Sequence, residues 1–117
     1  MSESELGPED RKIVTLARSV RARNGVAEGA AVRDATGRTY AAGTVGLPSL
    51  RLSAVRAAVA MAVASGAESL EAVAVVTEAE ALAAGDEDLA AVRDLAGPGT
   101  PVFVAGPDAS LRAVLST

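Results

Sequence analysis

The densest group of side chains that could carry chemistry lies in residues 77–88, TEAEALAAGDED. Its carboxylates are Glu78, Glu80, Asp86, Glu87 and Asp88. Two or three of them at one crevice could hold Mg²⁺, because oxygen ligands suit this hard cation. The competing interpretation is that acidic residues at a helix N-terminus favour the helix dipole and that loop carboxylates favour solubility. Two interpretations of this stretch therefore remain open, a carboxylate–Mg²⁺ enzyme site and a solvated segment.

The residue types that the chain lacks exclude several kinds of catalytic and metal chemistry. None of the 117 residues is His or Cys. Disulfides, thiolate zinc sites and cysteine nucleophiles are therefore excluded, as are an imidazole base and the Ser-His-Asp arrangement. We expect no metal, no cofactor and no catalytic residue of these kinds.

A second candidate site is the helix start after Pro48, in the stretch SLRLSAVRAA. Backbone N–H groups at a helix N-terminus, with Arg51 and Arg56 nearby, could bind a phosphate. No glycine-rich phosphate loop accompanies them. A serine near a helix start is more often a cap than a ligand-binding group, so Ser53 is first interpreted as an N-cap.

Apolar periodicity and turn residues predict the elements that must position these groups. We expect helices at 8–24, 50–65, 86–95 and 108–115, the last capped by Asp108, and strands at 26–33, 38–45, 70–77 and 100–106. The order α-β-β-α-β-α-β-α favours a three-layer α/β/α sandwich with a mixed sheet, as one domain over 1–117 with a frayed tail at 1–7. In such sheets the helix starts near 53 and 86 could face one crevice.

Composition and charge restrict the partners. The net charge of −4 argues against nucleic acid, and no aromatic residue interrupts the basic side chains between Arg11 and Arg23, which we interpret as a solvated helix face. No segment is long and apolar enough for a membrane span and the start is polar and acidic, so we expect a cytoplasmic protein. Alanine-rich helices bury little area each, so we expect a homo-oligomer, a dimer or tetramer.

Three segments together resemble the cytidine deaminase superfamily in its small homotetrameric nucleoside branch. GAAVRDATGRTYAAGTV (29–45) is similar to the family hairpin that leads into N-V-E-N, and LSAVRAAVAMAVASG (52–66) is similar to the helix that begins C-A-E-R. TPVFVAG (100–106) is similar to the strand after the P-C-x-x-C helix. The resemblance implies the three-layer fold, a zinc ion on three His or Cys ligands, and a glutamate that shuttles a proton for the zinc-bound water.

Carried over position by position, the resemblance implies an emptied catalytic centre. The first zinc ligand falls on Ser53 and the catalytic glutamate on Val55, while the basic residue that follows is kept as Arg56. The paired cysteines fall near Gly85 and Asp88. These four non-ligating positions are vestigial under this interpretation, and Val55 cannot transfer a proton.

The nucleoside-contacting positions differ as well. The Asn and Glu of N-V-E-N fall on Thr44 and Gly46, and the aromatic residue near the base falls on Val26. Thr44, Gly46, Ser53 and Arg56 remain the candidate ligand-binding residues.

The sequence therefore predicts a deaminase-like protein that is inactive as a zinc deaminase and is kept for self-association, a protein partner or a nucleotide. The alternatives are an active nucleoside deaminase, as the family name would suggest, and a carboxylate–Mg²⁺ enzyme that uses residues 78–88. If side chains fill the old crevice, we expect Leu47, Leu52 and Val55 to do so.

Overall fold

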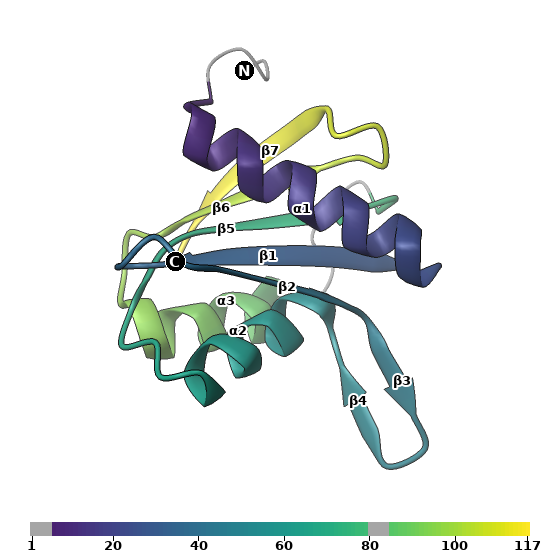
Figure 1. The fold of residues 1–117 in the computed structure, drawn as a ribbon, viewed down its shortest axis with the longest axis horizontal. Helices are drawn as coiled ribbons and strands as arrows, with labels where there is room; N and C mark the ends of the chain where they lie inside the picture. Colours follow the sequence, from purple (N-terminus) through teal and green to yellow (C-terminus); the bar gives the residue numbers. More distant parts are fainter. Residues whose placement is uncertain (1–5, 80–84) are drawn as a thin grey trace.

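The computed structural model describes residues 6–79 and 85–117, with residues 85 and 86 described by their backbone alone. The described chain begins with a helix, continues through four strands to a second helix, and ends in a strand (Figure 1). The elements are α1 (Pro8–Asn24), β1 (Glu28–Asp34), β2 (Thr39–Gly43), β3 (Val45–Leu47), β4 (Leu50–Leu52), α2 (Ala54–Ala64), β5 (Leu70–Thr77), α3 (Gly85–Ala96), β6 (Pro101–Ala105) and β7 (Leu111–Ser116).

Five strands form one mixed sheet in the order β2-β1-β5-β6-β7. β5 and β6 are parallel, and the other neighbours in this sheet are antiparallel. β5 lies in the centre and is buried along almost all of its length, as expected for an apolar run covered on both faces. The predicted mixed α/β sheet is confirmed, and so is the predicted central strand.

Helices cover both faces of the sheet and make three layers (Figure 1). α1 packs on a face built from small residues, including Ala31, Ala72 and Ala74. α2 and α3 pack on the opposite face, which presents valines such as Val32, Val73 and Val75. Small side chains let α1 approach the strands closely, and valines pack beneath the other two helices.

The first helix has the boundaries that its sequence predicts. Pro8 starts α1 and two acidic residues follow in its first turn. Gly25 ends it in the left-handed region, with a φ of 64°, and donates its N–H to the carbonyl of Arg21 at 2.9 Å. Within the described ranges, none of the helices has the length and apolarity needed to span a bilayer.

The prediction of a helix over residues 108–115 is wrong, because this segment forms β7. β7 pairs antiparallel with β6. Its inward residues alternate with exposed ones at a period of two, which is the pattern of a strand. Asp108 caps no helix. Its Oδ1 accepts hydrogen bonds from the N–H (2.9 Å) and the hydroxyl (2.6 Å) of Ser110 in the turn between β6 and β7.

The second helix starts later than predicted. Residues 45–52 form the hairpin of β3 and β4, which is a separate two-stranded sheet projecting from the body (Figure 1). α2 then begins at Ala54. The hairpin therefore separates Gly46 and Leu47 from the start of α2.

Candidate functional site

Ser53 is the N-cap of α2. Its backbone is extended, with φ −64° and ψ 159°, and its Oγ accepts the N–H of Arg56 at 3.2 Å. This hydrogen bond satisfies one of the N–H groups that the first helical turn leaves without a partner. The interpretation of Ser53 as a cap is confirmed.

The hydroxyl of Ser53 also reaches the first turn of α3. Its Oγ donates a hydrogen bond of 2.5 Å to Oδ1 of Asp88. The starts of α2 and α3 therefore meet, although the two residues are 35 positions apart. The expectation that these two helix starts face the same place is confirmed.

Asp88 is a buried carboxyl group with an incomplete set of partners. Asp88 is 1% exposed. Oδ2 is buried and accepts no hydrogen bond from the described part of the chain. Burial raises the pKa of Asp88 above its usual value, and the Ser53 hydrogen bond and the charge of Arg56 oppose that rise in pKa.

Apolar side chains occupy the rest of this region. They include two of the three residues that were predicted to fill it. Val55 is 1% exposed and belongs to the core beneath α2, and Leu52 packs against that core. Leu47 is 56% exposed on the projecting hairpin, so the prediction that it fills the old crevice is wrong. A three-residue strand that turns away from the body carries Leu47 out of reach.

The structure gives Thr44 and Gly46 roles other than the Ser53–Asp88 contact. Thr44 binds back to the start of β1, where its Oγ1 accepts the N–H of Glu28 at 3.1 Å and donates to the Glu28 carbonyl at 3.3 Å. Gly46 is exposed in β3, with open space around its α-carbon. Thr44 thus ties the end of β2 to the start of β1. Gly46 offers no side-chain group for ligand recognition.

Arg56 pairs with a carboxylate of α3. Its Nη1 lies 3.5 Å from Oε2 of Glu87, and both side chains are substantially exposed. Such a pair contributes little to stability. The carboxyl group of Asp88 already lies at the start of α2, so a phosphate at that helix N-terminus would meet a negative charge.

The carboxylates of the acidic stretch take separate partners. Glu78 pairs with Arg21 at 3.1 Å, Glu87 with Arg56 and Asp88 with Ser53. Glu80 and the side chain of Asp86 lie outside the described residues. Within the described part of the chain, no three carboxylates are grouped closely enough to hold a metal ion, and the proposed Mg²⁺ site gains no support there.

The donor atoms at the deaminase-like positions do not fit zinc. Protein zinc sites use three or four Cys, His or carboxylate ligands. Asp88 offers a single carboxyl group and Ser53 a hydroxyl, while Val55 and Gly85 offer no side-chain donor. Ser53 and Asp88, two of the positions that the resemblance assigned to a metal centre, therefore come together without the donor set that zinc needs.

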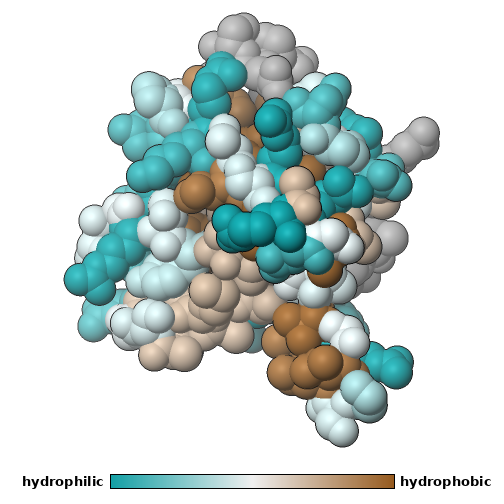
Figure 2. All heavy atoms as spheres, turned by 45° about the vertical axis from the view of Figure 1, so that its right-hand side comes forward, coloured by the Kyte–Doolittle hydropathy of each residue, from teal (hydrophilic) through white to brown (hydrophobic). Residues whose placement is uncertain are grey.

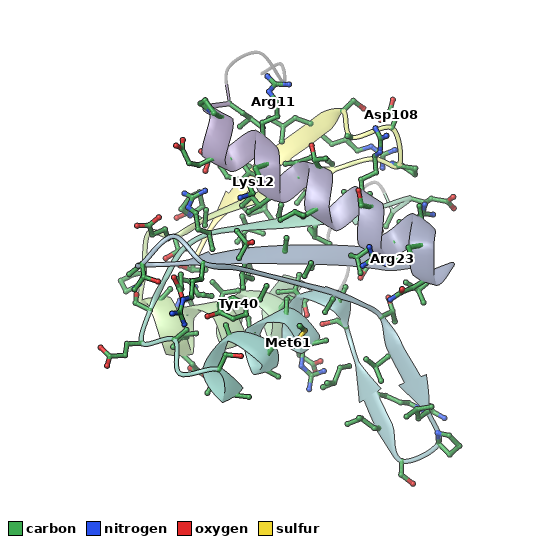
Figure 3. All side chains as sticks on the ribbon, viewed as in Figure 1. Arg11, Lys12, Arg23, Tyr40, Met61 and Asp108 are labelled. Carbon is green, nitrogen blue, oxygen red and sulfur yellow. The ribbon has the colours of Figure 1, made fainter. Side chains whose placement is uncertain are left out.

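No pattern in the sequence indicated the cavity of about 580 Å³ at the other end of α2. It lies between the β1–β2 turn and the connection from α2 to β5, where Asp34, Arg38, Tyr40, Ser65 and Glu68 are among the lining residues (Figure 3 labels Tyr40). The stretch DATG in this turn signalled a hairpin but gave no sign of a cavity.

Asp34 organises this turn. Its Oδ1 accepts hydrogen bonds from the N–H (2.9 Å) and hydroxyl (2.7 Å) of Thr36 and from the N–H of Arg38 (3.0 Å). The hydroxyl of Tyr40 donates to Oδ2 at 3.0 Å. The Thr36 hydroxyl, with help from the other donors, lowers the pKa of Asp34 to about 2, although burial opposes this.

Comparison with known proteins identifies relatives of this fold. A model of the family described as cytidine deaminase-like matches residues 6–109. A cytidine deaminase from Burkholderia pseudomallei has a similar structure, with a TM-score of 0.74 and 22% identity over 91% of this chain and 89% of that one. One from Mycobacterium leprae gives a TM-score of 0.67 and 19% identity, covering 90% of each chain. No curated protein matches the sequence.

Proposed function

Because the chain belongs to the cytidine deaminase-like family, we propose that it keeps the fold without zinc-dependent deamination and acts through self-association. Deamination of a cytosine ring requires an activated water and a group that carries a proton to the leaving amine. This chain offers neither a zinc ligand set nor a proton carrier at the corresponding positions. The two structural relatives are cytidine deaminases by name, and their activity is not transferred to this chain.

The observation that carries this proposal is the direct hydrogen bond between Ser53 and Asp88 beside a buried Val55. At 2.5 Å, the hydroxyl of Ser53 donates directly to one oxygen of the Asp88 carboxyl group. Val55 is packed in the core at the position of the proton shuttle. An ionised side chain there would have to be buried without a partner, at a cost of several kcal/mol.

The experiment is a metal analysis combined with a deaminase assay. The chain is purified in buffer supplemented with Zn²⁺, dialysed, and assayed for cytidine turnover beside the Burkholderia pseudomallei enzyme as a positive control. We expect no stoichiometric zinc and no uridine above the enzyme-free blank. One zinc per chain, or turnover that increases with protein concentration, would overturn the proposal.

The self-association part rests on the outer face of α2. A surface helix ordinarily carries polar residues on its solvent side. The exposed residues of α2 are instead Ala60, Met61, Val63 and Ala64. Met61 and Val63 are 44% and 52% exposed, and Arg56 is the one charged residue of this helix. An apolar outer face of this kind is typical of a contact surface.

The β3–β4 hairpin adds a second exposed apolar feature. Leu47 and Leu50 are 56% and 50% exposed, and Figure 2 shows the hairpin as a hydrophobic projection from a mostly hydrophilic surface. Burying two leucines and the face of α2 against a second copy would remove this apolar area from water. These features support a homo-oligomer.

A further inference from the structure

We propose that the Ser53–Asp88 hydrogen bond replaces a metal ion as the link between the starts of α2 and α3, so that the fold of this chain is stable without metal. This inference rests on the proposed function, since it assumes that zinc does not bind at these positions. It adds that the emptied centre has a structural role, and it assigns that role to one pair of side chains.

The two helices lie on the same face of the sheet and contribute to one core (Figure 1). Val92 of α3 is fully buried there, with Leu89 and Leu95 packed beside it. This apolar contact fixes the middle and the end of α3. At its start, the contacts with α2 are polar, namely the Ser53–Asp88 hydrogen bond and the Arg56–Glu87 ion pair.

In this arrangement the two oxygens are too close together to be ligands of one zinc ion. Oxygen ligands of a tetrahedral zinc lie about 2.1 Å from the metal, which places them about 3.4 Å from each other. Ser53 Oγ and Asp88 Oδ1 are 2.5 Å apart, the separation of a short hydrogen bond to a carboxylate. The side chains have therefore closed onto each other.

The direction of the hydrogen bond follows from the donors available. A serine hydroxyl has one proton. Ser53 Oγ accepts the backbone N–H of Arg56, so its own proton is free to point to Asp88. One side chain thus caps α2 and binds α3 at the same time. The Arg56–Glu87 pair is longer, at 3.5 Å, and more exposed, so it is the weaker of the two links.

Substitution can distinguish two roles of Asp88, whose Oδ2 has no hydrogen-bond partner among the described residues. If Asp88 serves as a hydrogen-bond acceptor for Ser53, asparagine can replace it, because the amide oxygen accepts the same bond and no charge is buried. If Asp88 were present to hold a cation, asparagine would fail. We therefore expect Asp88→Asn to keep the link and Asp88→Ala to break it.

The test is a double-mutant cycle on the full chain, measured by urea unfolding. We expect Ser53→Ala and Asp88→Ala each to reduce the folding equilibrium constant about 30-fold, and the double variant to lose much less than the product of the two losses. Asp88→Asn should lose less stability than Asp88→Ala, because its amide oxygen keeps the bond from Ser53 although its NH2 takes the buried place of Oδ2. Asp94→Ala, an exposed carboxylate on the same helix, is the matched control and should change little.

A chelator series distinguishes this inference from the proposed function. We expect the parent melting temperature to be unchanged by excess EDTA and by added Zn²⁺. A chelator-induced fall would overturn the proposed function and the inference together. Two results would overturn the inference alone and leave the absence of zinc chemistry intact. In the first, the loss in the double variant equals the product of the two single losses. In the second, Asp88→Asn is as unstable as Asp88→Ala.

Discussion

Gly29 of β1 lies directly against the backbone of Ala17 in α1. A Cβ added to Gly29 would lie 2.1 Å from the Ala17 carbonyl oxygen and 2.9 Å from the Cβ of Arg21. Both neighbours belong to the helix, so neither can rotate out of the way. A glycine inside a strand often marks such a close approach of another element.

Gly29→Ala should therefore push α1 away from the sheet. We expect a loss of about 3 kcal/mol and a melting temperature lower by roughly 10 °C. The matched control is Gly46→Ala, where an added Cβ meets no atom within 4 Å. Equal melting temperatures for the two variants in a calorimetric scan would contradict the close packing of α1 on β1.

Asp34 should make stability depend on acid pH. Its pKa is about 2 in the folded chain against 3.8 for an ordinary aspartate, so the unfolded chain binds more protons between these values. The stability that Asp34 contributes is fully present above about pH 4 and is lost as the pH falls to about 2. Urea midpoints measured across this window should fall less for Asp34→Asn than for the parent.

Glu68→Gln, which changes an exposed carboxylate that lines the same cavity, serves as the control for this titration. It should follow the parent curve through the acid window. If Asp34→Asn and the parent lost stability in parallel from pH 4 to pH 2, the low pKa of Asp34 would be refuted.

Restoring a carboxylate at the position of the proton shuttle should destabilise the chain. Val55 is 1% exposed and packs within an apolar cluster, so Val55→Glu would bury a charged carboxylate among apolar side chains. We expect a loss of about 4 kcal/mol in urea unfolding at pH 7 and no gain in cytidine turnover. Val114→Glu makes the same change at a 37% exposed position of β7 and should cost less than 1 kcal/mol.

Charges on the outer face of α2 and on the hairpin should dissociate the oligomer. Leu50→Asp and Met61→Glu each place a carboxylate on a side chain that is exposed in the single chain, so folding should be preserved. Sedimentation velocity should show a shift to the monomer mass for both variants. A parent that is already monomeric at micromolar concentration would contradict self-association, as would an unchanged oligomer in both variants.

Segments with a clear local pattern were predictable from the sequence. α1 has a proline start, an apolar stripe and a glycine stop, and β5 is a continuous apolar run between polar flanks. The segment LRAVLS of β7 is too short for its period to be decided locally. The free edge of β6 decides it by offering hydrogen-bond partners, and that edge exists only in the assembled sheet.

The site was predictable in position but not in chemistry. Resemblance aligned Ser53 and Asp88 with metal ligands, and the fold brings them together. Their direct hydrogen bond depends on the distance between the starts of α2 and α3. No local sequence pattern encodes that distance. Leu47 was misplaced for the same kind of reason, since two three-residue strands joined at Pro48 carry almost no periodic signal.

The Tyr40–Asp34 hydrogen bond also gives this protein a built-in optical probe. The chain contains one tyrosine and no tryptophan, so its intrinsic fluorescence comes from a single phenol. In the folded chain that phenol donates to a carboxylate at the rim of the cavity. Tyrosine emission therefore reports on the surroundings of one phenol at one end of the sheet, without a label.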